Sequence, residues 1–113
     1  MNKQSLEELL VEIGRSPLLT LEEELALLKV VQEKGTDCDE MKQLEKANMR
    51  FIVSVAAQYQ RQGLTLEELM EAGKDGLKKA EEKYNPKADF GFESYAVWWI
   101  RQRIIQAITE NNK

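Results

Sequence analysis

The chain has 113 residues, of which 42% are hydrophobic and 32% are charged, and its formal net charge is −4. This size predicts one small soluble domain with a modest core, and the acidic balance argues against a general binder of duplex DNA, which needs a basic surface. The single cysteine, Cys38, and the lack of histidine exclude disulfide frameworks, zinc sites and acid–base chemistry that depends on histidine.

The first two predicted elements are helices that begin with capping boxes, in which a Ser or Thr is followed three residues later by Glu. The sequence Ser-Leu-Glu-Glu at 5–8 predicts a short helix over 5–13, and Thr-Leu-Glu-Glu at 20–23 predicts a helix through Lys34. A glycine follows each of them, as is common at helix ends, and the Ser-Pro pair at 16–17 makes the connection.

Two longer helices are predicted in the middle of the chain. The first is expected to have Asp37 as its N-cap and to run up to Gly63, with apolar residues at near-heptad spacing between them. Another Thr-Leu-Glu-Glu box, at 65–68, opens the second, whose apolar side reaches Tyr84. Together with one more helix near the C-terminus, these elements predict an all-α fold, a compact bundle of about five helices with no sheet.

The last predicted helix begins near Glu93 or Ser94 and gathers most of the aromatic residues of the chain. One face carries, at helical spacing, Tyr95, Trp98, Trp99, Gln102 and Gln106. The opposite face has a separate apolar stripe of Ala96, Ile100, Ile104, Ala107 and Ile108, so the aromatic face is not needed for the core. An aromatic stripe is more often core than a binding surface, but the glutamines and the nearby Phe90 and Phe92 favour a platform for nucleic-acid bases.

Residues 90–102 read Phe-Gly-Phe-Glu-Ser-Tyr-Ala-Val-Trp-Trp-Ile-Arg-Gln. This run resembles the promoter-melting helix of region 2 in the bacterial sigma-70 family of transcription initiation factors, whose pattern is close to F-x-F-S-T-Y-A-x-W-W-I-R-Q. The similarity continues upstream at 48–59, 63–69 and 76–84. A weaker similarity, to the region just before region 2, covers 13–20.

The resemblance implies a domain organisation and a set of partners. It divides the chain into an N-terminal helical segment like sigma region 1.2 at 1–36 and a region 2-like helical domain at 37–113. It implies that the domain binds RNA polymerase core, through a coiled coil of the largest subunit, and that it recognises and melts the promoter minus-ten element. Contact with DNA would be mainly with the non-template single strand, and an anti-sigma factor is a further partner that the family suggests. No cofactor, metal or catalytic residue is implied.

The site residues implied by the resemblance fall into two groups. Those expected to contact DNA are Asn48, Lys83, Tyr84, Phe90, Phe92, Ser94, Tyr95, Trp98, Trp99 and Gln102. Those expected to contact polymerase are Glu67, Glu68, Glu71, Lys74 and Lys78. Aromatic rings would stack on unpaired bases, Gln102 would contact an adenine edge, and Asn48 would line a pocket for a flipped base. The residues alone favour other interpretations, because an Asn within an apolar stripe, such as Asn48, is more often a satisfied core amide and a charged helix side is usually a solvated face.

The chain departs from the family pattern at both groups of residues. Ala72 stands where the family has an acidic residue, and Lys74 stands where it has Asn, which alters the expected polymerase contact. Few basic residues precede the first aromatic, and Glu93 adds a negative charge beside the expected DNA path, so attraction to phosphates should be weaker. Ile105 and Gln106 replace the usual Thr and Arg that help to read the upstream base pair, which predicts a different base preference.

An enzyme is not expected, because the chain has no phosphate-binding loop and no nucleophile beside a base. Its carboxylate pairs, such as Glu22-Glu23 and Glu81-Glu82, are expected on exposed helix faces, where no apolar pocket raises a pKa. No apolar run is long enough to span a membrane and no signal peptide is recognisable, so a cytoplasmic location without membrane contact is expected. The rival function is a shortened sigma-like interaction module that binds polymerase or another protein without selecting promoters.

Overall fold

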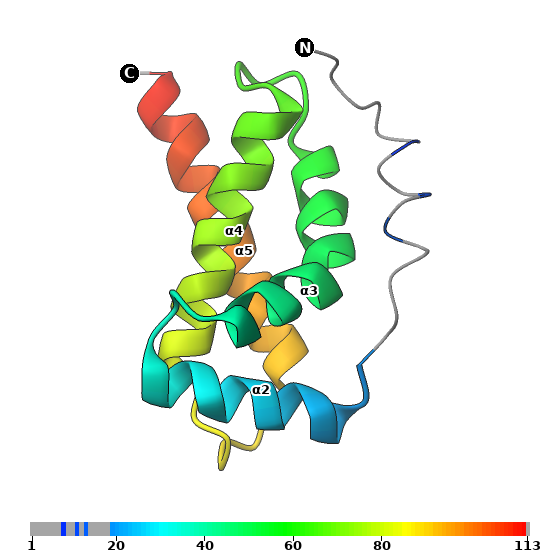
Figure 1. Ribbon diagram of the computed structural model, residues 1–113. Helices are drawn as coiled ribbons and strands as arrows, with labels where there is room; N and C mark the ends of the chain where they lie inside the picture. Colours follow the sequence, from blue (N-terminus) through cyan, green and yellow to red (C-terminus); the bar gives the residue numbers. More distant parts are fainter. Residues whose placement is uncertain (1–7, 9–10, 12, 14–18, 113) are drawn as a thin grey trace.

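The computed structural model describes residues 8, 11, 13 and 19–112, and this part of the chain contains helices but no strand. The helices labelled in Figure 1 are α2 (Leu21–Lys34), α3 (Asp39–Gln58), α4 (Leu66–Lys83) and α5 (Phe92–Asn111). The predicted all-α fold without a sheet is therefore confirmed, but the predicted number of about five helices is wrong, because the described residues form four. None of the helices in the described part is both long and apolar enough to cross a membrane.

The fifth expected helix, over 5–13, lies outside the described residues except for Glu8, Val11 and Ile13. These three residues are in helical conformation. The capping boxes at the starts of α2 and α4 are confirmed. In each, the Thr hydroxyl accepts from the Glu backbone N–H at 3.1 Å, and the Glu carboxylate accepts from the Thr backbone N–H at 2.9 Å.

The ends of α3 differ from the prediction. Its N-cap is Cys38 rather than Asp37, and the cap makes no side-chain hydrogen bond. α3 ends at Gln58, and the chain then turns through Arg61 (φ 70°) and Gly63 (φ 108°) before α4. Residues with positive φ cannot continue a right-handed helix. α3 therefore ends before Gly63, the limit predicted from the apolar spacing.

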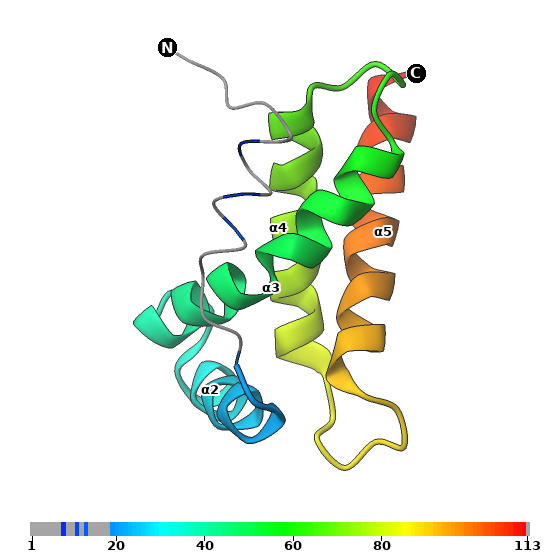
Figure 2. The same ribbon diagram turned by 90° about the vertical axis from the view of Figure 1, so that its right-hand side faces the viewer.

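α4 and α5 are antiparallel neighbours joined by the loop at 84–91; α5 passes behind α4 in Figure 1, and Figure 2 shows them side by side. α3 packs across α4, and α2 lies across the lower end of the assembly in Figure 1. The close approach of α4 to α5 depends on Gly76, because a Cβ there would lie 2.5 Å from the carbonyl oxygen of Trp99 and 2.8 Å from the Cα of Ile100. This contact fixes the backbone that carries the aromatic residues.

The core is formed by apolar side chains from all four helices. Its completely buried members include Leu28, Leu44, Ile52, Leu69, Leu77, Ile100 and Ile104. The apolar stripe predicted for α5 is confirmed at Ala96, Ile100, Ile104 and Ile108, all of which are buried. α2 is also tied to α4 by Gln32, whose Nε2 donates to the carbonyl oxygens of Glu81 at 3.0 Å and Tyr84 at 2.7 Å.

Glu81 does not lie where the sequence led us to expect it. It was predicted on an exposed helix face, but its side chain is completely buried, and neither carboxylate oxygen has a hydrogen-bond partner within the described part of the chain. Burial, followed by repulsion from Glu45 and Glu24, raises the pKa of Glu81 to about 9. Glu81 is four residues after Leu77 and three before Tyr84, so it falls on the apolar side of α4.

Candidate nucleic-acid interface

Six aromatic side chains form a continuous cluster where the loop at 84–91 meets the first half of α5. Its members, which we call the ring cluster, are Tyr84, Phe90, Phe92, Tyr95, Trp98 and Trp99. Tyr84 is its centre. The centroid of its ring lies 6.0 Å from that of Phe90 and 5.2 Å from that of Phe92, both in edge-to-face geometry. A third neighbour, Tyr95, lies 5.6 Å away.

The ring cluster continues along α5 in pairs. Phe90 stacks on Tyr95 with ring centroids 5.4 Å apart and an interplanar angle of 30°. Tyr95 meets Trp99 edge-on at 6.4 Å, and Trp99 meets Trp98 edge-on at 5.4 Å. Such offset and edge-on pairs are the arrangements that aromatic rings favour. The sequence-predicted aromatic residues are thus brought together by contacts between the rings themselves.

The ring cluster has a buried base and an exposed edge. Phe92 and Tyr84 are 1% and 7% exposed, whereas Phe90 and Trp98 are 50% and 53% exposed. The hydroxyl of Tyr84 donates to the carbonyl oxygen of Phe90 at 2.8 Å, so its polar end is satisfied inside the protein. An outside molecule can reach the rings of Phe90 and Trp98, while Tyr84 and Phe92 hold the loop and the helix start in place.

Three of the polar residues predicted to contact DNA, Lys83, Ser94 and Gln102, are exposed around the ring cluster. Lys83 is at the end of α4, and Ser94 is in the first turns of α5. Gln102 lies one helical turn after Trp98 and is also exposed, so an exposed ring and an exposed amide are neighbours on the same face of α5.

Gln106, which was predicted on the same face as Gln102, is engaged in hydrogen bonds with neighbouring side chains. Its side-chain oxygen accepts from Nη1 of Arg103 at 2.9 Å, and its Nε2 donates to Glu110 at 3.2 Å. Arg103 is in turn paired with Asp75 of α4, to which its Nε donates at 2.9 Å. This network joins α5 to α4 and was not predicted, although the i, i+3, i+7 spacing of its α5 members is a sequence signal for it.

Asn48 is buried between helices rather than exposed beside the rings. Its Nδ2 donates to the carbonyl oxygen of Leu44 at 2.9 Å. Burial, followed by the charge of Glu93, raises the pKa of Glu24 on α2, and the side chain of Asn48 opposes this rise. The amide nitrogen of Asn48 therefore has a partner inside the protein in this conformation.

The surroundings of the ring cluster carry charges of both signs. Lys83 and Lys87 are exposed, and so are Asp89 and Glu93. Because the charges of these four residues cancel, the ring cluster has little attraction for phosphates from its immediate neighbours.

The five residues predicted to contact polymerase lie on α4. Glu67, Glu68 and Glu71 are exposed, and Lys74 and Lys78 are half-buried. The carboxylate of Glu68 takes part in the capping box with Thr65. Lys74 lies between two carboxylates, with its Nζ 3.5 Å from Glu71 and 3.6 Å from Glu45 of α3. Glu68, Glu71 and Lys74 on this face therefore already make contacts within the domain.

Residues 44–113 match the sequence profile of the family described as Sigma-70 region 2, which is more than half of the chain. The chain therefore belongs to the sigma-70 region 2 family, as the resemblance indicated.

Characterised relatives agree with this assignment. The chain is 41% identical over 102 residues to the RNA polymerase sigma factor SigA of Lactococcus lactis subsp. cremoris, covering 89% of this chain and 28% of the relative. It is 43% identical over 101 residues to SigA of Listeria monocytogenes, covering 89% of this chain and 26% of the relative. It is 41% identical over 118 residues to SigA4 of Synechococcus elongatus, covering 88% of this chain and 38% of the relative. The chain thus spans only about a quarter to two fifths of their lengths.

Proposed function

We propose that the chain acts as a sigma-factor domain that binds RNA polymerase core and recognises and melts the minus-ten element of promoters. The observation that carries this proposal is the pair of half-exposed rings, Phe90 and Trp98, on a ring cluster whose base is buried. Family membership supports the same role. In this proposal the chain is a transcription initiation factor without catalytic activity of its own, and it works in the cytoplasm.

The exposed rings would capture unpaired bases. A base stacked on an aromatic ring contributes roughly 1–3 kcal/mol, and flipping a base out of a duplex costs a few kcal/mol, so two stacked bases offset much of the cost of melting. Phe90 and Trp98 would stack directly, and the half-buried Tyr95 and Trp99 would contribute the parts of their rings that remain accessible. Bases inside an intact duplex are hidden from such rings, which gives the ring cluster a preference for a single strand.

The polar neighbours would add contacts of different kinds. Gln102 can pair with an adenine edge through both atoms of its amide, which would give sequence preference. Lys83 and Ser94 would contact phosphates, which position the strand without reading it. Because Asn48 is buried, it would line a pocket for a flipped base only if the side chains that cover it move. Tyr84 and Phe92 would support the exposed rings from below.

The polymerase contact is assigned to the charged face of α4, through a coiled coil of the largest subunit. Glu67 and Glu71 would make the main contacts, because the carboxylate of Glu68 is engaged in the capping box. Polymerase would also supply the positive channel that a chain of net charge −4 lacks. We propose that residues 37–113 carry these functions, with 1–36 as a region 1.2-like segment, and that an anti-sigma factor would compete for the same surfaces.

The charge of the chain favours a second candidate, an interaction module that binds polymerase without selecting promoters. The exposed Asp89 and Glu93 beside the ring cluster oppose phosphate binding. In that case the ring cluster would serve only to hold the loop against α5.

Fluorescence anisotropy with labelled minus-ten DNA separates the two candidates. A non-template single strand and the matching duplex are each titrated with polymerase core alone and with core plus the chain. The sigma-domain proposal predicts that the chain strengthens binding of the single strand far more than that of the duplex or of a scrambled strand. If the chain joins core but leaves all three affinities unchanged, the interaction module is the correct function.

A further inference from the structure

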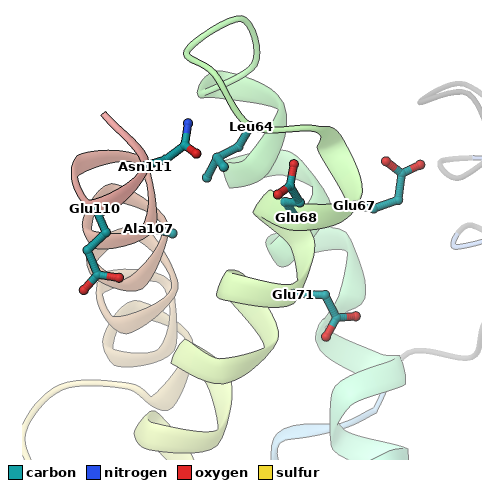
Figure 3. A pocket seen from close by; sticks show the side chains of 7 residues that line it. All are labelled: Leu64, Glu67, Glu68, Glu71, Ala107, Glu110 and Asn111. Carbon is teal, nitrogen blue, oxygen red and sulfur yellow. The ribbon is translucent and has the colours of Figure 1, made fainter. Parts of the chain in front are cut away.

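A groove runs between the start of α4 and the end of α5, with a volume of about 540 Å³. Figure 3 shows Leu64 and Ala107 between the two helices, Glu110 and Asn111 on the α5 side, and three glutamates on the α4 side. These glutamates are Glu67, Glu68 and Glu71. The groove therefore has an apolar floor and glutamates on both of the helices that border it, with the side chains of Glu67 and Glu71 pointing away from α5 in Figure 3. Only the α4 rim belongs to the residues that the family resemblance assigns to polymerase.

Three carboxylates of the groove, those of Glu67, Glu71 and Glu110, have few cations near them among the described residues. Among the described residues, no Lys or Arg lies within ion-pair distance of Glu67 or Glu110. Glu71 shares Lys74 with Glu45, so that one cation serves two carboxylates. A negative potential thus surrounds an apolar surface, and this combination repels phosphates and attracts a cationic partner.

The α5 side of the groove is held in position by contacts to other elements. The Nδ2 atoms of Asn111 and Asn112 donate to the carbonyl oxygens of Gly63 and Gln62, both at 3.4 Å, which ties the end of α5 to the turn before α4. Glu110 accepts from Gln106, a member of the network that joins α5 to α4. The two sides of the groove are therefore fixed relative to each other. This lowers the conformational entropy that the groove loses when a partner binds.

We propose that this groove holds a helical segment of polymerase core whose apolar ridge is flanked by Lys or Arg on both sides, and that α5 supplies half of the contact through Glu110 and Ala107. The proposal rests on the proposed function and extends it, because it gives the DNA-capturing helix a direct part in polymerase docking. A small residue at position 107 leaves room for a partner side chain beside Leu64. Basic residues on only one side of the ridge would leave one rim without a partner.

The contact also links docking to the network on α5. The carboxylate of Glu110 that would receive a partner cation is the one that accepts from Gln106, which is bonded to Arg103. A cation at Glu110 competes for this acceptor, so docking would alter the hydrogen bonding of residues one turn from Gln102.

Binding of the whole chain to polymerase core tests the proposal. The dissociation constants of the labelled wild type and of Glu110→Lys, Glu110→Gln, Ala107→Leu and Glu71→Lys are measured over a range of salt concentrations. Glu33→Lys is the matched control, because Glu33 is exposed on α2 and the substitution makes the same change in charge as Glu110→Lys. Circular dichroism checks that each variant is folded.

We expect Glu110→Lys to weaken binding by about tenfold and to reduce its salt dependence, with a smaller effect for Glu110→Gln. Ala107→Leu should weaken binding without changing the salt dependence, because it fills the groove with an apolar group. Glu33→Lys should bind like wild type. If Glu71→Lys weakens binding while the Glu110 and Ala107 variants bind like wild type, the role of α5 is wrong and the proposed function stands. If the wild type itself does not bind core, both fail.

Discussion

The hydroxyl of Tyr84 and the carbonyl oxygen of Phe90 are joined by a 2.8 Å hydrogen bond across the loop between α4 and α5. The loop is shaped further by Asn85, whose side chain accepts from the backbone N–H of Lys87 at 2.9 Å and whose carbonyl accepts from that of Ala88 at 2.9 Å. These bonds place the half-exposed ring of Phe90 on the ring of Tyr95. The binding edge of the ring cluster is therefore organised before any partner arrives.

Removing only the hydroxyl tests this organisation. Tyr84→Phe keeps the ring in the core and should lower the free energy of unfolding by only about 0.5–1.5 kcal/mol, the usual worth of one hydrogen bond. It should weaken single-strand binding by polymerase core plus the chain, because Phe90 would no longer be held against Tyr95. Thermal melts and single-strand titrations measure the two effects. Unchanged DNA affinity would show that the hydrogen bond does not organise the binding edge.

The buried carboxyl of Glu81 predicts an unusual dependence of stability on pH. Its pKa is about 9 in the folded chain against an ordinary value of 4.5, so below pH 4.5 the folded and unfolded chains both keep the proton. Between these values only the unfolded chain loses it, so the stability contributed by this group falls as pH rises, by at most about 1.4 kcal/mol per pH unit. Glu45, Glu24 and Glu82 strengthen the effect, and Lys78 opposes it.

Glu81→Gln removes the ionisable group while keeping the size of the side chain. Between pH 5 and 9 we expect the variant to lose less stability than wild type, and to be the more stable of the two at pH 8. Urea unfolding at several pH values measures this difference. Parallel curves for the two proteins would mean that Glu81 is not buried as described.

The contact at Gly76 predicts that α4 and α5 tolerate no side chain between them. Gly76→Ala would drive a Cβ into the backbone of Trp99 and Ile100, which should destabilise the fold by roughly 1–3 kcal/mol. Gly91→Ala is the matched control, because its Cβ would meet nothing within 4 Å and its φ of −74° suits any residue. Thermal melts of the two variants should differ clearly. Equal melting temperatures would mean that the helices are farther apart than in this structure.

Local signals in the sequence predicted much of the fold. The capping boxes at Thr20 and Thr65 fix the starts of α2 and α4, because both halves of each box depend only on residues three apart. The start of α3 was missed, since Asp37 and Cys38 are both acceptable before a helix and tertiary packing decides between them. The burial of Glu81 was not predicted, although its position four residues after Leu77, on the apolar side of α4, is a sequence signal for it.

The aromatic residues were predicted as a group but not individually. Helical spacing separated the exposed Trp98 from the buried Ile100, because both are within α5. Spacing could not show that Phe92 turns inward while Phe90 turns outward, since the two flank Gly91, where loop becomes helix. Nor could it show that the hydroxyl of Tyr84 reaches back to Phe90, because that bond depends on the path of the whole loop.

The central claim is that exposed rings capture unpaired promoter bases, and Trp98→Ala tests it most directly. Because Trp98 is 53% exposed, its loss should destabilise the fold much less than Leu77→Ala, for which roughly 2–5 kcal/mol is expected. With polymerase core present, the affinity of the Trp98 variant for the labelled non-template minus-ten strand should fall by about tenfold to a hundredfold, the worth of one stacked base. Gln102→Ala should instead relax the preference at one base and leave other sequences bound as before. A folded Trp98→Ala variant that binds core and holds the single strand as tightly as wild type would contradict the account.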